Sequence, residues 1–196
     1  MLGMEAVTKG KLQYIITKEK APKEEETKNI TLSHYGTQET LEVQEEEEKE
    51  YDALLFGSAL HYGLEMLASF EKSSLDVAMI CVQNKFGHEL SDSMTISIKK
   101  RMGNLLENET FLGYLEGATL LKEQSLSFKG ELKKVDLILE YGDRNMVIDY
   151  KSSKKFHVKD KKQVGVYQKA IEKITQKSTR GVIVYLLEDE VEFFEI

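Results

Sequence analysis

The sequence has one cysteine, one proline and no long apolar run, and each shortage excludes a class of protein. Cys81 alone can form neither an internal disulfide framework nor a four-cysteine iron–sulfur cluster, and its apolar neighbours predict a buried thiol. No apolar run approaches the roughly 18 residues of a membrane span, and no secretory signal opens the chain. A GxxxxGK[ST] loop is also lacking, so these residues contain no nucleotide-driven motor. We therefore expect a cytoplasmic protein without a membrane segment.

The net charge of −7 is unevenly distributed along the chain. Residues 1–52 hold 7 lysines and 13 acidic residues, whereas residues 53–196 hold 20 basic and 21 acidic residues. In contrast to the acidic first quarter, residues 151–162 contain six lysines and one aspartate. A basic run of this kind can follow a phosphate backbone, or it can be a solvated loop.

Composition divides the chain into two parts. Residues 1–50 are highly charged and contain the only proline, Pro22, which predicts an acidic attachment or linker region with a possible short strand over 12–17. Residues 51–196 are expected to form the globular domain. The acidic segment Glu42–Glu50 lies just before this domain, where it would either compete with a phosphate backbone for the basic run or act as a solvated linker.

The globular part reads as helices, then strands, then a helix and two more strands. Helical spacing of apolar residues predicts helices over 51–70, 75–86 and 94–106. A further helix is expected from an N-cap at Asp160 to about residue 174. Runs rich in apolar residues predict strands over 120–128, 132–141, 145–151, 181–186 and 191–194. This order predicts an α/β fold with a central mixed β-sheet flanked by helices.

Three charged side chains lie on the two strands that flank the turn at 141–144. If 142 and 143 form a two-residue turn, the register places Asp136 directly opposite Asp149. Lys151 then lies beside Asp149, because alternate residues of a strand share a face. The other face is filled by the apolar residues at 137, 139, 146 and 148. Unpaired buried charge is costly, so these three groups are expected to pair, contact water or hold a metal ion.

These residues belong to an ordered set with a known counterpart. Gly57-x-x-x-His61, Asp136, Asp149-Tyr150-Lys151 and Gln163-x-x-x-Tyr167 together resemble the nuclease domain of RecB-type and AddA-type helicase–nucleases, within the PD-(D/E)xK superfamily. The resemblance covers about residues 51–187 and implies a restriction-endonuclease-like core. Val135 replaces the proline of the superfamily motif, and the cysteines of the iron–sulfur relatives are absent, so no cluster is expected.

Phosphodiester cleavage explains why these residue types would gather. The reaction needs an activated water and neutralisation of charge on phosphate oxygens, and Mg²⁺ supplies both. Asp136 and Asp149 suit direct ligation, and the Tyr150 carbonyl is a candidate neutral ligand. The resemblance adds His61 as a ligand, and imidazole suits Mn²⁺ better than Mg²⁺. Lys151 would orient the attacking water or stabilise transition-state charge.

The remaining candidates are assigned to positioning. Gln163 and Tyr167 would position the DNA backbone or the catalytic lysine, with Lys154 and Lys155 as further DNA contacts. Glu123, on the strand before the hairpin, is a possible accessory acid. Each assignment has a simpler rival, since an aspartate and a lysine on neighbouring strands can form a plain ion pair, and tyrosine at helical spacing is usually a core residue.

The resemblance implies a Mg²⁺- or Mn²⁺-dependent DNA exonuclease domain of a helicase–nuclease that acts in double-strand-break processing and recombinational repair. Its expected partners are DNA, as single strands or duplex ends, and the helicase part of the same or a partner polypeptide. Two alternatives stay open: a non-catalytic module of the same fold that binds DNA ends or docks a partner, and a sequence-specific endonuclease of the same superfamily.

Overall fold

The computed structural model describes residues 5–8, 11–14, 37–128 and 130–196, with side chains from residue 48 onward. The chain divides into two compact units, residues 1–40 and 41–196. In the first unit, β1 (Glu5–Thr8) and β2 (Lys11–Tyr14) form an antiparallel hairpin that includes part of the strand expected over 12–17. The rest of that strand and the stretch that opens at Pro22 lie outside the described residues.

The second unit is built on one mixed sheet, which confirms the predicted α/β fold. Its five strands are hydrogen-bonded in sequence order, and every neighbouring pair is antiparallel except β5 with β6. The strands are β3 (Thr119–Phe128), β4 (Glu131–Glu140), β5 (Arg144–Lys151), β6 (Ser178–Leu186) and β7 (Val191–Glu195). The parallel pair is possible because helix α5 (His157–Thr175) connects β5 to β6.

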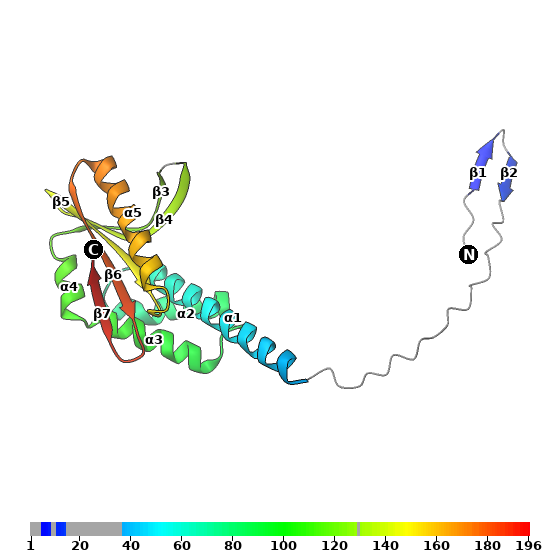
Figure 1. The fold of residues 1–196 in the computed structure, drawn as a ribbon, viewed down its shortest axis with the longest axis horizontal. Coiled ribbons are helices and arrows are strands. Elements are labelled where there is room, and N and C mark those ends of the chain that lie inside the picture. The colour runs from blue at the N-terminus through cyan, green and yellow to red at the C-terminus, as the bar shows by residue number, and fades with distance from the viewer. Residues whose placement is uncertain (1–4, 9–10, 15–36, 129) are drawn as a thin grey trace. The chain divides into compact units, whose positions relative to one another are not determined.

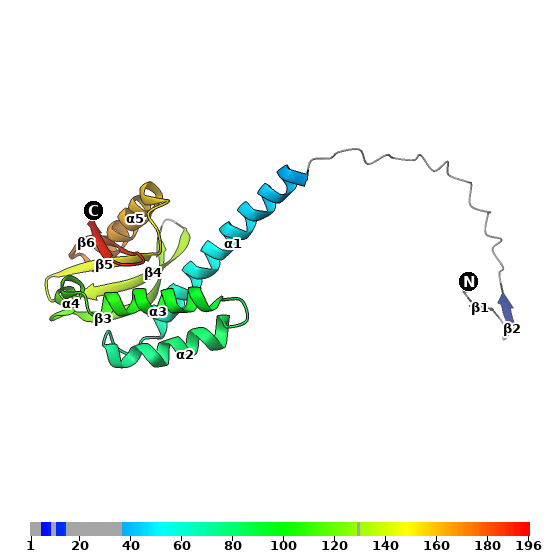
Figure 2. The ribbon, with the colours of Figure 1, turned by 90° about the horizontal axis from the view of Figure 1, so that it is seen from below.

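Helices cover both faces of this sheet, as Figures 1 and 2 show. On one face, α5 packs through Val164, Tyr167, Ala170 and Ile171. On the other face lie α1 (Thr37–Met66), α2 (Leu75–Phe86), α3 (Asp92–Leu106) and α4 (Glu109–Leu115), with a short 3₁₀ turn, η1 (Lys72–Ser74), before α2. The result is a three-layer α/β/α arrangement.

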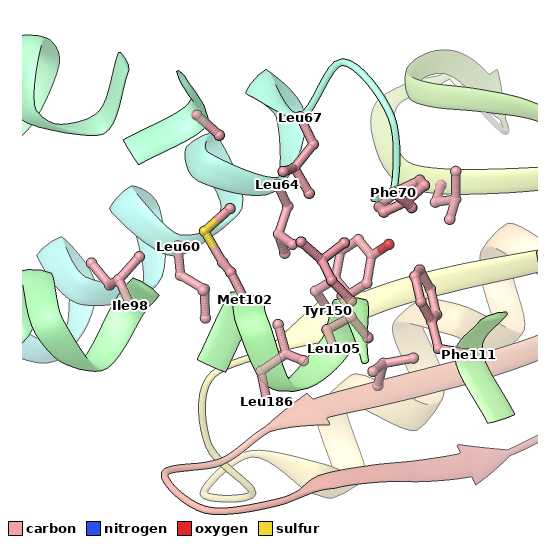
Figure 3. Close-up of a cluster of buried hydrophobic side chains, with 14 of the residues drawn as sticks. Leu60, Leu64, Leu67, Phe70, Ile98, Met102, Leu105, Phe111, Tyr150 and Leu186 are labelled. Carbon is pink, nitrogen blue, oxygen red and sulfur yellow. The ribbon is translucent and has the colours of Figure 1, made fainter. Parts of the chain in front are cut away.

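The main core lies between the sheet and helices α1 to α4 (Figure 3). Tyr150 of β5 and Leu186 of β6 project from the sheet into a cluster supplied by the helices, whose members include Leu60, Leu64, Leu67, Ile98, Met102, Leu105 and Phe111. Burial of a large apolar side chain contributes about 1.5–3 kcal/mol. This packing therefore holds α1 firmly against one face of β5.

The predicted β4–β5 register is confirmed. Leu137 pairs with Ile148 and Leu139 with Met146, and all four side chains are buried on the face covered by α1 to α4. The N–H of Tyr141 donates to the carbonyl of Arg144 at 2.9 Å, which closes the expected two-residue turn. A turn of fixed length therefore sets which side chains face each other along this hairpin.

Helix boundaries depend on capping that the periodicity alone did not predict. Helix α1 begins at Thr37 and ends at Met66, so the acidic segment Glu42–Glu50 is part of a helix. The helix expected from 94 begins at Asp92, because the Ser91 side chain accepts a hydrogen bond from the Met94 N–H. Helix α4 was not predicted; it is capped by Asn108, which accepts from the Phe111 N–H.

Two other expectations are wrong. Asp160 is not an N-cap, because α5 already begins at His157 and the Asp160 carboxylate is buried in the helix, where it accepts a hydrogen bond from the Tyr185 hydroxyl at 3.2 Å. Cys81 is only partly buried rather than a core thiol. Within the described part of the chain, none of the helices has the length and apolar character needed to span a membrane.

Candidate functional site

Strands β4 and β5 part at the two aspartates. Leu137 and Ile148 form the last pair of the ladder, and Asp136 and Asp149 come directly after it. Beyond this point, the Tyr150 backbone N–H donates to Asp136 Oδ2 at 2.8 Å. The N–H and carbonyl of one strand residue face the same neighbouring strand, so the Tyr150 carbonyl also faces the β4 side.

Asp149 is the most deeply buried charged group of the site, with a side chain only 3% exposed. Lys151 Nζ lies 2.6 Å from Asp149 Oδ2, and no other group donates a hydrogen bond to this oxygen. Burial, followed by the negative charge of Asp136, raises the pKa of Asp149 to about 6, although the ammonium of Lys151 opposes the shift. The carboxylate is therefore only partly neutralised by the protein.

Lys151 connects the aspartates to helix α5. Its Nζ donates to Gln163 Oε1 at 3.3 Å, and Gln163 Nε2 in turn donates to the Tyr167 hydroxyl at 2.6 Å. Burial lowers the pKa of Lys151, but the charges and hydrogen bonding of the nearby aspartates outweigh burial and leave the pKa raised. Lys151 is therefore an ammonium at neutral pH, and Gln163 connects it to Tyr167.

His61 reaches the site from α1. Its Nδ1 lies 3.3 Å from Asp136 Oδ1, and its side chain is 32% exposed. Burial lowers the pKa of His61, but the hydrogen bond and charge of Asp136, with a smaller effect of Asp149, leave the pKa raised. Asp136 thus uses one oxygen for the Tyr150 backbone and the other for the imidazole.

The end of α1 is held in place by Lys122 of β3. Its ammonium donates to the main-chain carbonyls of Leu64, Glu65 and Leu67 at the end of the helix. Carbonyls at a helix C-terminus lack partners within the helix, so a cation there supplies both hydrogen bonds and favourable charge. His61 lies within the last two turns of α1, close to the end that Lys122 holds.

Glu123 sits opposite Asp136 in β3, at the one position between Lys122 and Gln124 that does not pair with β4. Its φ of 54° is in the left-handed region, which is unusual for a residue with a side chain. The Glu123 carboxylate is paired with Lys134 Nζ at 2.5 Å, and Glu65 lies 3.8 Å from the same ammonium. The structure therefore places Glu123 near the site but commits its charge to Lys134.

The donor set is chemically suited to a divalent cation, although the side chains do not form a closed cage. Among the residues that the structure describes, no three His, Cys, Asp or Glu side chains converge to enclose an ion. His61 is turned to Asp136, and the ammonium of Lys151 contacts Asp149. Two neighbouring carboxylates, one with a buried oxygen that faces only the ammonium of Lys151, are nevertheless oxygen ligands of the type that Mg²⁺ binds.

A groove of about 930 Å³ opens beside these residues. One wall is α1, from Lys49 to His61, and the other wall is the segment from Lys151 to Asp160. Lys155 lines the groove, whereas Lys154 is paired with Glu192 of β7. The end of the acidic segment is also present in the first wall, through Lys49 and Glu50.

Sequence reasoning missed two residues that shape this groove. Arg101 of α3 donates to the carbonyls of Ser152 and Leu186 at 3.0 and 2.8 Å, and its guanidinium lies 4.6 Å from the centre of the Phe56 ring. No local pattern distinguished Arg101 from other polar residues of its helix. The sequence does contain a signal for Phe156, which is an aromatic residue between lysines. The basic run over 151–162 was interpreted from its charge alone.

Comparison with known proteins finds solved structures that are similar to this chain. No family model matches the chain, and no curated protein matches it. The chain is similar to a candidate exonuclease from Eubacterium rectale, with 14% identity and a TM-score of 0.48 over 74% of this chain and 59% of that one. It is also similar to the protein SSO0001, with 17% identity and a TM-score of 0.32 over 60% of each chain. The chain therefore spans about three fifths of both structures.

Proposed function

We propose that this chain is a Mg²⁺- or Mn²⁺-dependent deoxyribonuclease domain that hydrolyses phosphodiester bonds. The observation that carries the proposal is the position of Asp136 and Asp149 where β4 and β5 part, with the ammonium of Lys151 2.6 Å from Asp149. A buried acid, a partly buried acid and a cation beside an open groove are unusual, because buried charge is retained only where it is compensated or used.

In this proposal each residue of the site has a role. Asp136, Asp149 and the Tyr150 carbonyl would hold the divalent ion, with His61 as a further ligand, and the bound ion would activate water and neutralise phosphate charge. Lys151 stays protonated and is placed to stabilise negative charge that develops on the phosphate. Gln163 holds the ammonium through its side-chain oxygen and is itself held by Tyr167.

The wider assignment rests on the order of the motif residues along the chain. It makes the protein the exonuclease domain of a helicase–nuclease in double-strand-break processing and recombinational repair. In that assembly, the helicase part of the same or a partner polypeptide would deliver single strands or duplex ends to the groove.

The test is a nuclease assay on linear and circular DNA with Mg²⁺, Mn²⁺ or a chelator. The wild-type chain should release nucleotides from linear DNA only when a divalent ion is present. Lys151→Ala should lose at least about 100-fold in rate, as is typical when a group that stabilises transition-state charge is removed. Lys169→Ala, which removes an exposed lysine of α5, should leave the rate unchanged. Unaltered cleavage by Lys151→Ala would reject the proposal.

A second candidate is a non-catalytic module that binds DNA ends. It is favoured by the ion pair between Lys151 and Asp149, which partly neutralises the site without a metal. This candidate predicts metal-independent DNA binding and no hydrolysis with either cation. Defined products from circular DNA would instead indicate the third alternative, a sequence-specific endonuclease.

A further inference from the structure

An exposed aromatic ring lies in the groove beside the proposed site. Phe156 is 48% exposed, although phenylalanine is usually buried, and it lines the same groove as His61 and Lys151. The ammonium groups of Lys155 and Lys159 lie 5.4 and 5.1 Å from the centre of its ring. The ring is therefore an exposed apolar surface with two ammonium groups near it. One belongs to the residue before Phe156 and the other to a residue three positions after it.

The walls around Phe156 are held in fixed positions. A Cβ added to Gly57 of α1 would lie only 3.7 Å from Ser152 Oγ, so the two walls approach closely at this point. Arg101 connects the two walls, because it donates to the Ser152 carbonyl and its guanidinium lies over the ring of Phe56 of α1. Phe156 itself immediately precedes α5, whose first residue is His157.

The charge of the groove suits a polyanion. Its lining includes four cationic side chains, Lys49, Arg101, Lys151 and Lys155, against two acidic ones, Glu50 and Asp160. Arg101 is already engaged with two carbonyls and with Glu188, so it is structural. Lys155 and Lys159 are exposed and their ammonium groups can turn toward phosphates.

We propose that this groove binds an unpaired stretch of DNA and that Phe156 stacks on one of its bases, while Lys155 and Lys159 contact the phosphates on either side. This inference deepens the proposed function, on which it rests, by assigning Phe156 as a residue that positions the bound strand. Bases inside a duplex have both faces covered by neighbouring pairs, so a protein ring can stack only on a single-stranded or splayed base. Stacking on Phe156 would therefore favour binding of single strands over binding of duplex.

The test measures binding in the presence of a chelator, so it does not depend on hydrolysis. A single-stranded oligonucleotide with 2-aminopurine at one position reports stacking by loss of fluorescence, and a blunt duplex serves as the comparison. Phe156→Ala should weaken single-strand binding about 5- to 150-fold, which corresponds to about 1–3 kcal/mol for one base–aromatic stack. In Phe156→Ala, 2-aminopurine at the stacked position should also regain its fluorescence. The affinity of this variant for the duplex should be nearly unchanged.

Matched variants separate stacking from folding. Phe156→Tyr keeps a ring and should retain both affinity and fluorescence quenching. Val158→Ala changes a neighbouring exposed apolar residue that does not line the groove, and should have no effect. Ala53→Glu puts an acidic group into the opposite wall with little loss of helix propensity, and should weaken single-strand binding as well.

Two outcomes overturn the inference: equal single-strand affinity for Phe156→Ala and wild type, or an equal loss of duplex and single-strand binding. If stacking is found but no divalent ion supports cleavage, the inference about the groove stands and the proposed hydrolytic function fails.

Discussion

The carboxylate of Asp136 accepts the backbone N–H of Tyr150 at 2.8 Å, in the place where the β4–β5 ladder has already ended. A side chain thus takes over a hydrogen bond that a strand partner would otherwise make. The contact fixes one oxygen of Asp136 and leaves the other toward His61, at 3.3 Å from Nδ1. The hairpin can therefore open at its end without leaving this N–H unsatisfied.

Asp136→Asn should lower the pKa of His61. The hydrogen bond and negative charge of Asp136 outweigh burial in the wild-type chain, and without them burial would dominate. The asparagine oxygen can still accept from Tyr150, so the fold should be retained. Titration of the imidazole by NMR measures the shift, with Asp143→Asn in the exposed turn as the control. An unchanged His61 pKa in Asp136→Asn would show that the two side chains do not interact in solution.

Asp149→Asn should stabilise the protein at neutral pH. The pKa of Asp149 is about 6 in the folded chain against 3.8 ordinarily, so the folded state holds the proton more tightly than the unfolded state. The free energy of unfolding therefore falls as pH rises from about 4 to about 6, by about 3 kcal/mol for two pKa units. The variant should be more stable than wild type by up to this amount at pH 7.5, and by much less at pH 4.5. Urea unfolding at both values tests this, and a less stable variant at pH 7.5 would contradict it.

Affinity for Mn²⁺ should rise with pH between 5.5 and 8. A metal ligand must be deprotonated, and both Asp149 and His61 have raised pKa values, so protons compete with the ion in this range. His61→Gln should weaken binding and flatten the pH dependence, because one competing proton is removed. Equilibrium binding at fixed ionic strength measures both effects. An affinity that is constant over this range would exclude both groups as ligands.

Lys122→Met should destabilise the chain by about 1.5–3 kcal/mol, because hydrogen bonds from a charged group to the carbonyls that end α1 are lost. The comparison is Lys133→Met, which removes an exposed pair with Glu131 and should cost about 0–1 kcal/mol. Thermal unfolding gives the difference. Equal effects would mean that Lys122 does not hold the helix end.

The sequence predicted the part of the site that depends on local geometry. A two-residue turn at 142–143 sets the register, and the register places Asp136, Asp149 and Lys151 together. The spacing of Gln163 and Tyr167 was sufficient to place them on one face of a helix, and the hydrogen bond between them confirms it.

The features that were missed depend on contacts distant in sequence. The left-handed backbone of Glu123 has no signature in its neighbours, because only its position opposite Asp136 distinguishes it. Asp160 was expected as a cap, since nothing local shows that Tyr185 would provide a buried partner. Arg101 was overlooked because its partners, Ser152 and Leu186, lie on other elements.

The most direct measurement is a calorimetric titration of Mn²⁺ into the full chain at pH 7.5, carried out in parallel on wild type and Asp149→Asn. We expect a saturable heat of binding for wild type that is lost or strongly reduced in the variant. If wild type shows no binding, or if both proteins bind equally well, the two aspartates do not hold a metal ion and the proposed hydrolysis has no site.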